Sequence, residues 1–268
     1  MSKVASELKH SSIVYTYPCG VVDIIHNSNG FMESGWECRE NDRDSKKRPR
    51  EKGKIAEGAD LVRSMNRARA KLRRLALAND FRWFVTLTLD PEKIDRSNGA
   101  AVAAALGTWA DNMVRRKKLK YVLVPELHKK GGIHFHGFFN DAVEVVDSGH
   151  TDRAGHRIYN LPEWKLGFTT AIALYGDYPS AVGYVTKYIG KQGVRPMGRW
   201  YYSGGQLKEP GKTYADLEYA TLMEQSCGKA VEFSTPGGKL TIIHTKMEVW
   251  NHDQASDIDP YDEQPGIR

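Results

Sequence analysis

The chain has 268 residues, 40% of them hydrophobic, which suits one catalytic domain of ordinary size with appendages, or two small domains. It contains no run of about 18 apolar residues and no apolar segment near its start, so we expect neither a membrane-spanning helix nor secretion. The formal net charge of +6 suits a polyanionic partner, and three scattered cysteines indicate a reducing compartment, the cytoplasm, rather than a disulfide framework.

The first part of the chain divides into an irregular extension and a basic helix. Residues 1–57 are rich in Gly, Asn, Ser and charged residues, and they favour an irregular extension with one short strand at residues 21–25. In residues 59–78, apolar residues recur at intervals of three and four, which predicts a helix. Lys and Arg are concentrated between residues 43 and 74, so they cover much of the remaining surface of this helix and extend before it.

Strands and helices then alternate as far as residue 190. β-branched and aromatic residues predict a strand over residues 81–89, and an Ala-rich segment with an apolar stripe predicts a helix over residues 98–118. Two further strands, Tyr121–Leu127 and Ile133–Phe139, are joined by a Lys-Lys-Gly-Gly turn. The pattern is completed by a small hairpin over residues 143–160, a strand over residues 168–174 and a helix over residues 179–190.

This order of elements indicates an α+β fold, in which helices lie on one face of a mostly antiparallel sheet. We place the main domain at residues 58–205. The pattern weakens beyond it, where residues 206–250 form an appendage with one recognisable strand near its end. Residues 251–268 are acidic, and we expect them to form a disordered tail.

Two histidines alternate with apolar residues in the predicted strand Ile133–Phe139. Because successive side chains of a strand point to opposite faces, His134 and His136 project from the same face, where two neutral imidazoles can bind one ion. Glu126, on the preceding strand, supplies a third ligand. Such a set of oxygen and nitrogen donors suits Mg²⁺ or Mn²⁺ in phosphate chemistry better than structural Zn²⁺. The alternative is a pair of histidines that make ordinary hydrogen bonds on a half-buried strand.

The position of Glu126 depends on how the two strands pair. Directly opposed residues of an antiparallel pair share a face, so Glu126 joins the histidines only if it lies opposite His134 or His136. That requires a connection of three or five residues instead of four, because pairing with Phe135 puts the carboxylate on the wrong face. In the favoured register His128 shares this face, as a further ligand or a phosphate contact.

The predicted helix over residues 179–190 carries two tyrosines four residues apart, Tyr184 and Tyr188, which therefore lie on one helical face. Lys187 and Lys191 each follow a tyrosine by three residues. A phenol is a weak nucleophile at neutral pH because its pKa is about 10, but a nearby ammonium group favours the phenolate. The pattern predicts tyrosine nucleophiles with lysines as helper cations, and an ordinary amphipathic helix is the alternative.

Three blocks of sequence, in this order, resemble the HUH-class rolling-circle replication initiators, the Rep endonucleases. They are residues 84–91, which include Thr86 and Thr88; Glu126-Leu127-His128 followed by His134-Phe135-His136; and Tyr184-Val185-Thr186-Lys187-Tyr188. The doubled tyrosine is similar to that of initiators from small single-stranded DNA phages and related plasmids. The resemblance covers about residues 60–205.

The resemblance implies a sheet of about five antiparallel strands with flanking helices, as in an RNA-recognition fold. It implies nicking of single-stranded or extruded origin DNA, which leaves a 5′-phosphotyrosine and a free 3′-OH that primes rolling-circle synthesis. The second tyrosine would then resolve the new junction. Thr86 and Thr88 would contact the substrate. The arginines that we expect to contact duplex or hairpin DNA are Arg63, Arg67, Arg73 and Arg74.

Other proteins carry out the steps that this chain is not expected to perform. The sequence contains no GxxxxGK[ST] motif, so we expect a host helicase to unwind the DNA and a host polymerase to extend the 3′-OH. Two other functions share parts of the pattern. A transposase or relaxase uses the same tyrosine chemistry, and a non-catalytic module that binds RNA or DNA uses the same kind of sheet.

Overall fold

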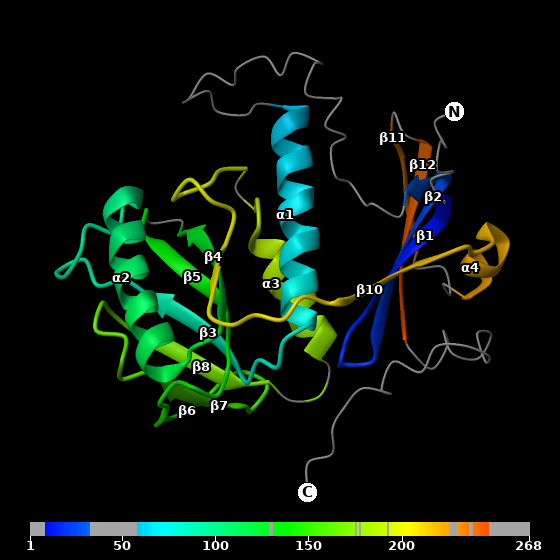
Figure 1. Cartoon of the computed structure of the whole chain (residues 1–268). Helices are drawn as coiled ribbons and strands as arrows, with labels where there is room; N and C mark the ends of the chain where they lie inside the picture. The colour runs from blue at the N-terminus through cyan, green and yellow to red at the C-terminus, as the bar shows by residue number, and fades with distance from the viewer. Residues whose placement is uncertain are drawn as a thin grey trace, which may run out of the picture. The chain divides into compact units, whose positions relative to one another are not determined.

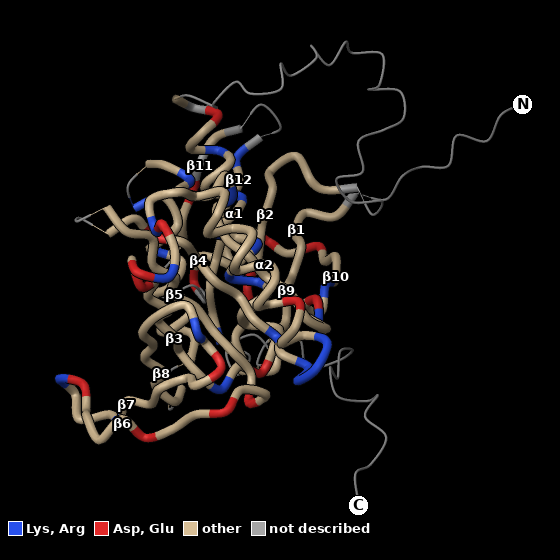
Figure 2. The backbone as a smooth tube through the Cα atoms, turned by 90° about the vertical axis from the view of Figure 1, so that its left-hand side faces the viewer, with Lys and Arg blue, Asp and Glu red and all other residues tan. Residues whose placement is uncertain are grey.

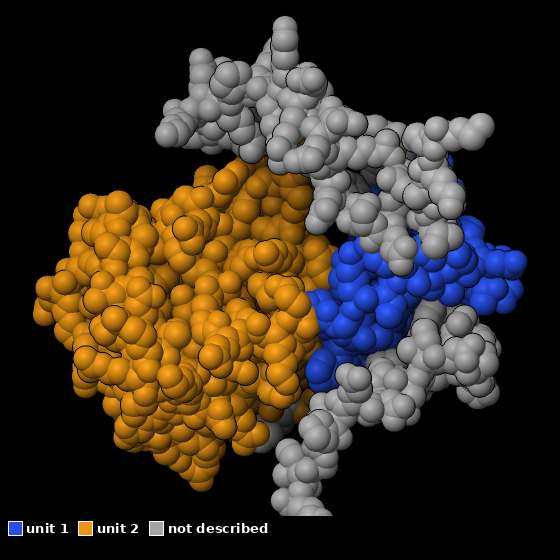
Figure 3. All heavy atoms as spheres, in the orientation of Figure 1, with its two compact units in different colours: residues 1–52, 210–268 blue, residues 53–209 orange. Residues whose placement is uncertain are grey.

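The computed structural model describes residues 9–32, 58–128, 131–174, 176, 178–191, 193–225, 230–235 and 238–246. They belong to two compact units, coloured separately in Figure 3. The central unit is formed by residues 53–209, and the terminal unit by residues 1–52 together with residues 210–268. The expected acidic tail and the part of the basic segment before residue 58 lie outside the described residues.

The described part of the central unit alternates strands and helices nearly as the sequence pattern predicts (Figure 1). Its helices are α1 (Ala59–Leu77), α2 (Gly99–Lys117) and α3 (Tyr178–Tyr188). Its strands are β3 (Trp83–Thr88), β4 (Tyr121–Leu127), β5 (Ile133–Phe139), β6 (Val146–Thr151), β7 (Arg157–Asn160), β8 (Thr169–Ala173) and β9 (Tyr202–Gly204). β4 and β5 have the predicted bounds. β9 was not predicted, because so short a strand is defined only by its pairing with β4.

These strands form one antiparallel sheet in the order β6-β7-β8-β3-β5-β4-β9. The α+β class is therefore confirmed, but this sheet has seven strands rather than about five, because the hairpin β6–β7 and the short β9 extend its two edges. β3 lies between β8 and β5 and pairs Thr86 with His136 and Thr88 with His134. The first of the three sequence blocks is thus the neighbour of the histidine strand.

Alternation along the strands gives this sheet two apolar faces. On one face, Leu87 and Phe135 are fully buried in a core that includes the apolar stripe of α2. The other face carries Phe84 and Phe138, and α3 covers it, with Tyr184 edge-on to Phe84 at a centroid distance of 6.0 Å. α1 packs against α3. The expectation that the helices lie on one face is therefore wrong, because apolar residues occupy both parities of the strands.

The terminal unit is a second antiparallel sheet that is built from both ends of the chain. Its strands are β1 (Lys9–Thr16), β2 (Val21–Met32), β10 (Gly211–Ala215), β11 (Ala230–Thr235) and β12 (Gly238–Lys246), in the order β10-β1-β2-β12-β11, and its helix is α4 (Tyr219–Gln225). None of the helices among the described residues is long and apolar enough to cross a membrane.

An irregular extension over residues 1–57 is the wrong expectation for residues 9–32, where only part of β2 was predicted. β2 pairs with β1 on one side and with β12 on the other, and its Ile24 packs in a small core with Ile243. The pattern was hard to read because the partner β12 is distant in sequence and because polar residues are buried in this sheet. The buried polar residues on β1 and β2 are Ser12, Asp23, His26 and Asn27.

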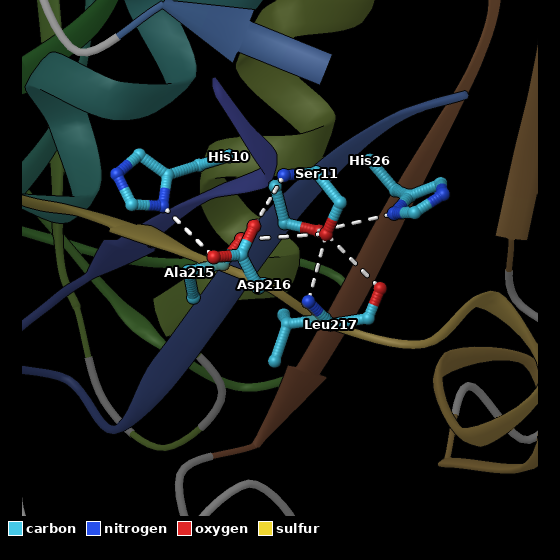
Figure 4. Close-up of polar contacts among 7 residues, drawn as sticks. His10, Ser11, His26, Ala215, Asp216 and Leu217 are labelled. Atoms are coloured by element: carbon cyan, nitrogen blue, oxygen red, sulfur yellow. Dashed lines mark hydrogen bonds and ion pairs between the residues drawn. The ribbon is translucent and has the colours of Figure 1, made fainter. Parts of the chain in front are cut away.

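Polar contacts join β1 to the segment that follows β10 (Figure 4). The backbone N–H of Ser11 donates to the carboxylate of Asp216 at 3.0 Å, and Nδ1 of His10 lies 3.2 Å from the other carboxylate oxygen. The Ser11 hydroxyl donates to the carbonyl of Leu217 at 3.0 Å and accepts the N–H of the same residue at 2.7 Å. Since these groups satisfy one another, we assign them the structural role of joining the N-terminal and C-terminal strands.

Candidate active site

β4 and β5 place the predicted metal ligands on one face of the sheet. Glu126 lies directly opposite His134, which is one of the two registers that strand alternation allowed, and five residues connect the two strands. The predicted register is therefore confirmed. His134 and His136 are partly buried on this face, whereas Ile133 and Phe135 are fully buried in the core with α2.

Both oxygens of the Glu126 carboxylate are engaged. Oε2 accepts a hydrogen bond from Nε2 of His136 at 2.9 Å, and Oε1 accepts one from the ammonium group of Lys191 at 2.6 Å. The other ring nitrogen of His136, Nδ1, lies 3.1 Å from the hydroxyl of Thr86. Because a carboxylate only accepts, His136 donates from Nε2, and its Nδ1 accepts from Thr86. The ring is thus oriented from both sides.

His134 is surrounded by polar and cationic groups. Its Nδ1 lies 3.5 Å from the hydroxyl of Thr88, and its ring stacks on that of His128 at a centroid distance of 5.0 Å. Arg96, in the loop between β3 and α2, accepts the N–H of Ile133 with its backbone carbonyl at 3.0 Å. Sequence reasoning missed Arg96, because only the fold brings this loop to the start of β5.

Burial tunes the charges of this cluster. It lowers the pKa of His136, although the charge of Glu126 opposes the shift. It also lowers the pKa of His134, and the charges of His128 and Arg96 lower it further. Both imidazoles are therefore neutral at neutral pH, the form that binds metal ions. Burial raises the pKa of Glu126, but the hydrogen bond from Lys191 and the charge of His136 outweigh it, and the net shift is downward. The carboxylate is ionised.

Both tyrosines of α3 lie over the histidine face. The ring of Tyr188 stacks on that of His136, with centroids 4.1 Å apart and planes inclined by 14°. The Tyr188 hydroxyl donates to the hydroxyl of Tyr184 at 2.6 Å, and Tyr184 is 51% exposed. Burial, and then the hydrogen bond to Tyr184, raise the pKa of Tyr188. The structure thus brings two phenol oxygens to the ligand set, with Tyr188 enclosed and Tyr184 accessible.

Contacts from α1 hold the end of the tyrosine helix. Arg69 donates two hydrogen bonds to the carbonyl oxygen of Ile189, the residue after Tyr188, from Nε at 3.1 Å and from Nη2 at 2.7 Å. Gly190 has a φ of 73°, and a Cβ there would collide with the side chain of Met65. Arg69 therefore supports α3. The sequence does not separate it from the other arginines of this helix.

The remaining predicted basic residues lie at different depths, and all Lys and Arg positions are marked in Figure 2. On α3, Lys187 is exposed, whereas Lys191, just beyond the helix, reaches Glu126 and lies 5.2 Å from the ring of Tyr188. On α1 the structure places two predicted arginines on the exposed surface and two partly buried: Arg63 and Arg67, and Arg73 and Arg74 respectively.

The donor set of Glu126, His134 and His136 suits a cation. Among the described residues no three such side chains converge on one point in this conformation. Instead, the Lys191 ammonium occupies one oxygen of Glu126, and His136 contacts the other. A cation thus already lies at the carboxylate, as a stand-in for a divalent ion, and the two neutral imidazoles provide donors that such an ion accepts.

Residues 82–193 match a family model described as a replication-associated protein of the ORF2 type. The matched segment contains β3, β4, β5 and α3, and with them the threonines, the ligand set, both tyrosines and both lysines. It leaves out α1 and the terminal unit. No match was found among curated proteins or among solved structures.

Proposed function

We propose that this chain initiates DNA replication by nicking single-stranded origin DNA with a tyrosine of α3. The family match over residues 82–193 supports a replication initiator. The observation that carries the nicking chemistry is the stack of Tyr188 on His136, which brings the paired phenols of Tyr188 and Tyr184 to the carboxylate of Glu126. A nucleophile and a phosphate-binding set that lie side by side favour attack, since no large approach remains to be made.

The proposed reaction exchanges one phosphate ester for another. The phenol oxygen of Tyr184 or Tyr188 attacks phosphorus in line with the departing 3′-oxygen. The new O–P bond forms as the P–O3′ bond breaks, the phenol gives up its proton, and the 3′-oxygen takes one up. The products are a 5′-phosphotyrosine and a free 3′-OH. Because the ester bond is kept on the protein, reverse attack by a 3′-OH religates the strand without ATP.

Each residue of the site has a part in this reaction. Glu126, His134 and His136 would hold Mg²⁺ or Mn²⁺, which supplies positive charge to the non-bridging phosphate oxygens when bound. Thr86 and Thr88 orient the imidazoles and face the strand. The remaining assigned residues provide positive charge or polar contacts to the phosphates near the nick: Lys191, Lys187 and His128.

Other contacts and partners lie outside the catalytic face. The arginines of α1 that we assign to DNA further from the nick are Arg63, Arg67, Arg73 and Arg74. A host helicase unwinds the origin, and a host polymerase extends the free 3′-OH in the cytoplasm of the host. The HUH fold and the two-tyrosine mechanism are part of this proposal.

The test is the formation of a covalent adduct on labelled single-stranded origin DNA with Mn²⁺. We expect a protein–DNA band that survives denaturation, and its loss in a double variant, Tyr184→Phe with Tyr188→Phe, that still binds the DNA. His136→Ala should abolish nicking and keep the fold. An adduct that persists in the double variant would place the nucleophile elsewhere. A wild-type protein that binds without cleaving would be a non-catalytic module, and a moved DNA segment instead of a religated circle would indicate a transposase or relaxase.

A further inference from the structure

Phe168 is the most exposed large hydrophobic side chain among the described residues, with 74% of its surface accessible. It immediately precedes β8, and its carbonyl oxygen accepts the N–H of Thr88 at 2.8 Å, so it continues the β8–β3 pairing by one residue. Single exposed apolar residues are common on protein surfaces. The position of Phe168 therefore matters more than its exposure.

The alternation of β8 places Phe168 on the histidine face. Ala171 is fully buried in the core with α2, so Phe168 and the exposed Thr170, which have the other parity, point to the opposite face. Phe168 lies beside Thr88 there, and Thr88 pairs on its other side with His134. Since neighbouring strands are about 4.8 Å apart, Phe168 and His134 are separated by two strand spacings, or roughly 10 Å.

The backbone that carries Phe168 is held in place. Gly167 packs so closely against the carbonyl of Thr88 and the N–H of Asp90 that a Cβ would collide with both. The indole N–H of Trp164 donates to the same Thr88 carbonyl at 3.1 Å. The exposed ring therefore stands on an ordered backbone, and a ligand that binds it need not order a loop first.

The surroundings of the ring favour a nucleobase over an apolar protein partner. A protein interface on this face would need a continuous apolar patch, whereas the groups around Phe168 on this face are Thr88, Thr170 and His134, with the cationic Arg96 affecting the last of these. One flat apolar ring among hydrogen-bonding and cationic groups matches one nucleotide. Its base stacks on the ring, while its phosphate approaches the polar groups.

We propose that Phe168 is a stacking platform for one unpaired base of the DNA strand that enters the active site. The proposal rests on the proposed function and adds to it a subsite that holds the strand without reading its sequence, since every base has a π face. A base fixed there keeps the neighbouring phosphates close to the Glu126–His136 pair and limits which phosphate meets the tyrosines.

The test compares two labelled strands that carry the same charge. One is an oligothymidine of about 12 nucleotides, and the other is an abasic strand of equal length, which keeps the phosphates and lacks the bases. Fluorescence anisotropy is measured in EDTA, so that cleavage does not interfere, for the wild type, Phe168→Ala, Phe168→Tyr and Val146→Ala. Val146 is 48% exposed, lies on β6 and serves as the matched apolar control.

We expect Phe168→Ala to weaken binding of oligothymidine by about 5- to 100-fold and to leave binding of the abasic strand unchanged. Phe168→Tyr, which keeps a ring, and Val146→Ala should bind both strands like the wild type. An equal loss for both strands, or no loss for either, overturns the stacking proposal. Because the Phe168 side chain is exposed, the Ala variant should keep the wild-type melting temperature.

Nicking is measured separately, so the two proposals fail in different ways. A wild-type protein that forms the adduct while Phe168→Ala binds oligothymidine normally keeps its function and loses the stacking platform. A wild-type protein that prefers oligothymidine through Phe168 but never forms the adduct keeps the platform and loses the nicking function.

Discussion

Tyr188 lies flat against His136, with ring centroids 4.1 Å apart, and its hydroxyl donates to that of Tyr184. The stack fixes the ring of Tyr188 between α3 and β5, whereas Tyr184 keeps 51% of its surface accessible. The two tyrosines, which are alike in sequence spacing, are therefore unlike in their surroundings. We expect this difference to divide their tasks, with Tyr184 attacking first and Tyr188 second.

The division of tasks is tested with the two single variants on fresh origin DNA. Tyr184→Phe removes the accessible oxygen and should slow the first adduct by on the order of 100-fold or more. Tyr188→Phe removes one hydrogen bond to the attacking oxygen, worth roughly 1 kcal/mol, and should slow it only about fivefold. Tyr188→Phe should instead lose the second transfer, which is measured as circle closure. A larger effect of Tyr188→Phe on the first adduct would reverse the order.

Lys191 competes with any divalent ion for the carboxylate of Glu126, because its ammonium group is 2.6 Å from Oε1. Lys191→Gln should therefore bind Mn²⁺ more tightly, by about two- to fivefold for an ion pair whose lysine is largely exposed, while it nicks more slowly. Isothermal calorimetry on the DNA-free protein measures the affinity. Lys187→Gln, an exposed position on the same helix, is the control and should not change it. Equal affinities of wild type and Lys191→Gln contradict the competition.

Arg69 and Arg67 are neighbours on α1 with different tasks. Arg69→Gln removes two hydrogen bonds to the Ile189 carbonyl and should lower the free energy of unfolding by about 1–3 kcal/mol in urea titrations. Arg67 is exposed, so Arg67→Gln should change stability by less than about 0.5 kcal/mol. It should instead reduce the salt dependence of DNA binding by about one phosphate contact. If both variants are equally stable, Arg69 does not anchor the tyrosine helix.

Gly137 separates the histidines from the core end of β5, and a Cβ there would collide with the carbonyl of Val122 on β4. Gly137→Ala should push β4 and β5 apart, disturb the Glu126–His136 contact and cost about 1–3 kcal/mol of stability. Gly107→Ala is the matched control, since a Cβ at Gly107 on α2 meets no atom within 4 Å and should stabilise the helix by about 0.5–1 kcal/mol. A Gly137→Ala protein as stable and as active as wild type contradicts the close strand approach.

The chemistry of the site was largely predictable because it depends on local periodicity. Two-residue alternation puts His134 and His136 together, and the same parity argument decides on which face Glu126 lies without knowledge of the whole sheet. Helical spacing likewise pairs Tyr184 with Tyr188. The approach of α3 to β5 does not follow from spacing, and at the sequence level it came only from the family resemblance.

Residues that long-range pairing brings to the site were not predictable. Arg96 reaches β5 through a loop, Arg69 reaches the carbonyl after Tyr188 through helix packing, and Phe168 joins the histidine face through two strand pairings. In the terminal unit, the buried Ser12 and His26 interrupt the apolar alternation that identifies a strand. Each case depends on a partner far away in the sequence.

The interleaved origin of the terminal unit constrains how the protein is made. The central unit is one uninterrupted stretch and can complete its sheet while synthesis continues, but β2 acquires its neighbour β12 only near the end of translation. Until then, one edge of the β1–β2 hairpin stays open, and open edges recruit other chains. Ribosome stalling or C-terminal truncation before residue 238 should therefore yield a protein that aggregates through its N-terminal strands, even with an intact central unit.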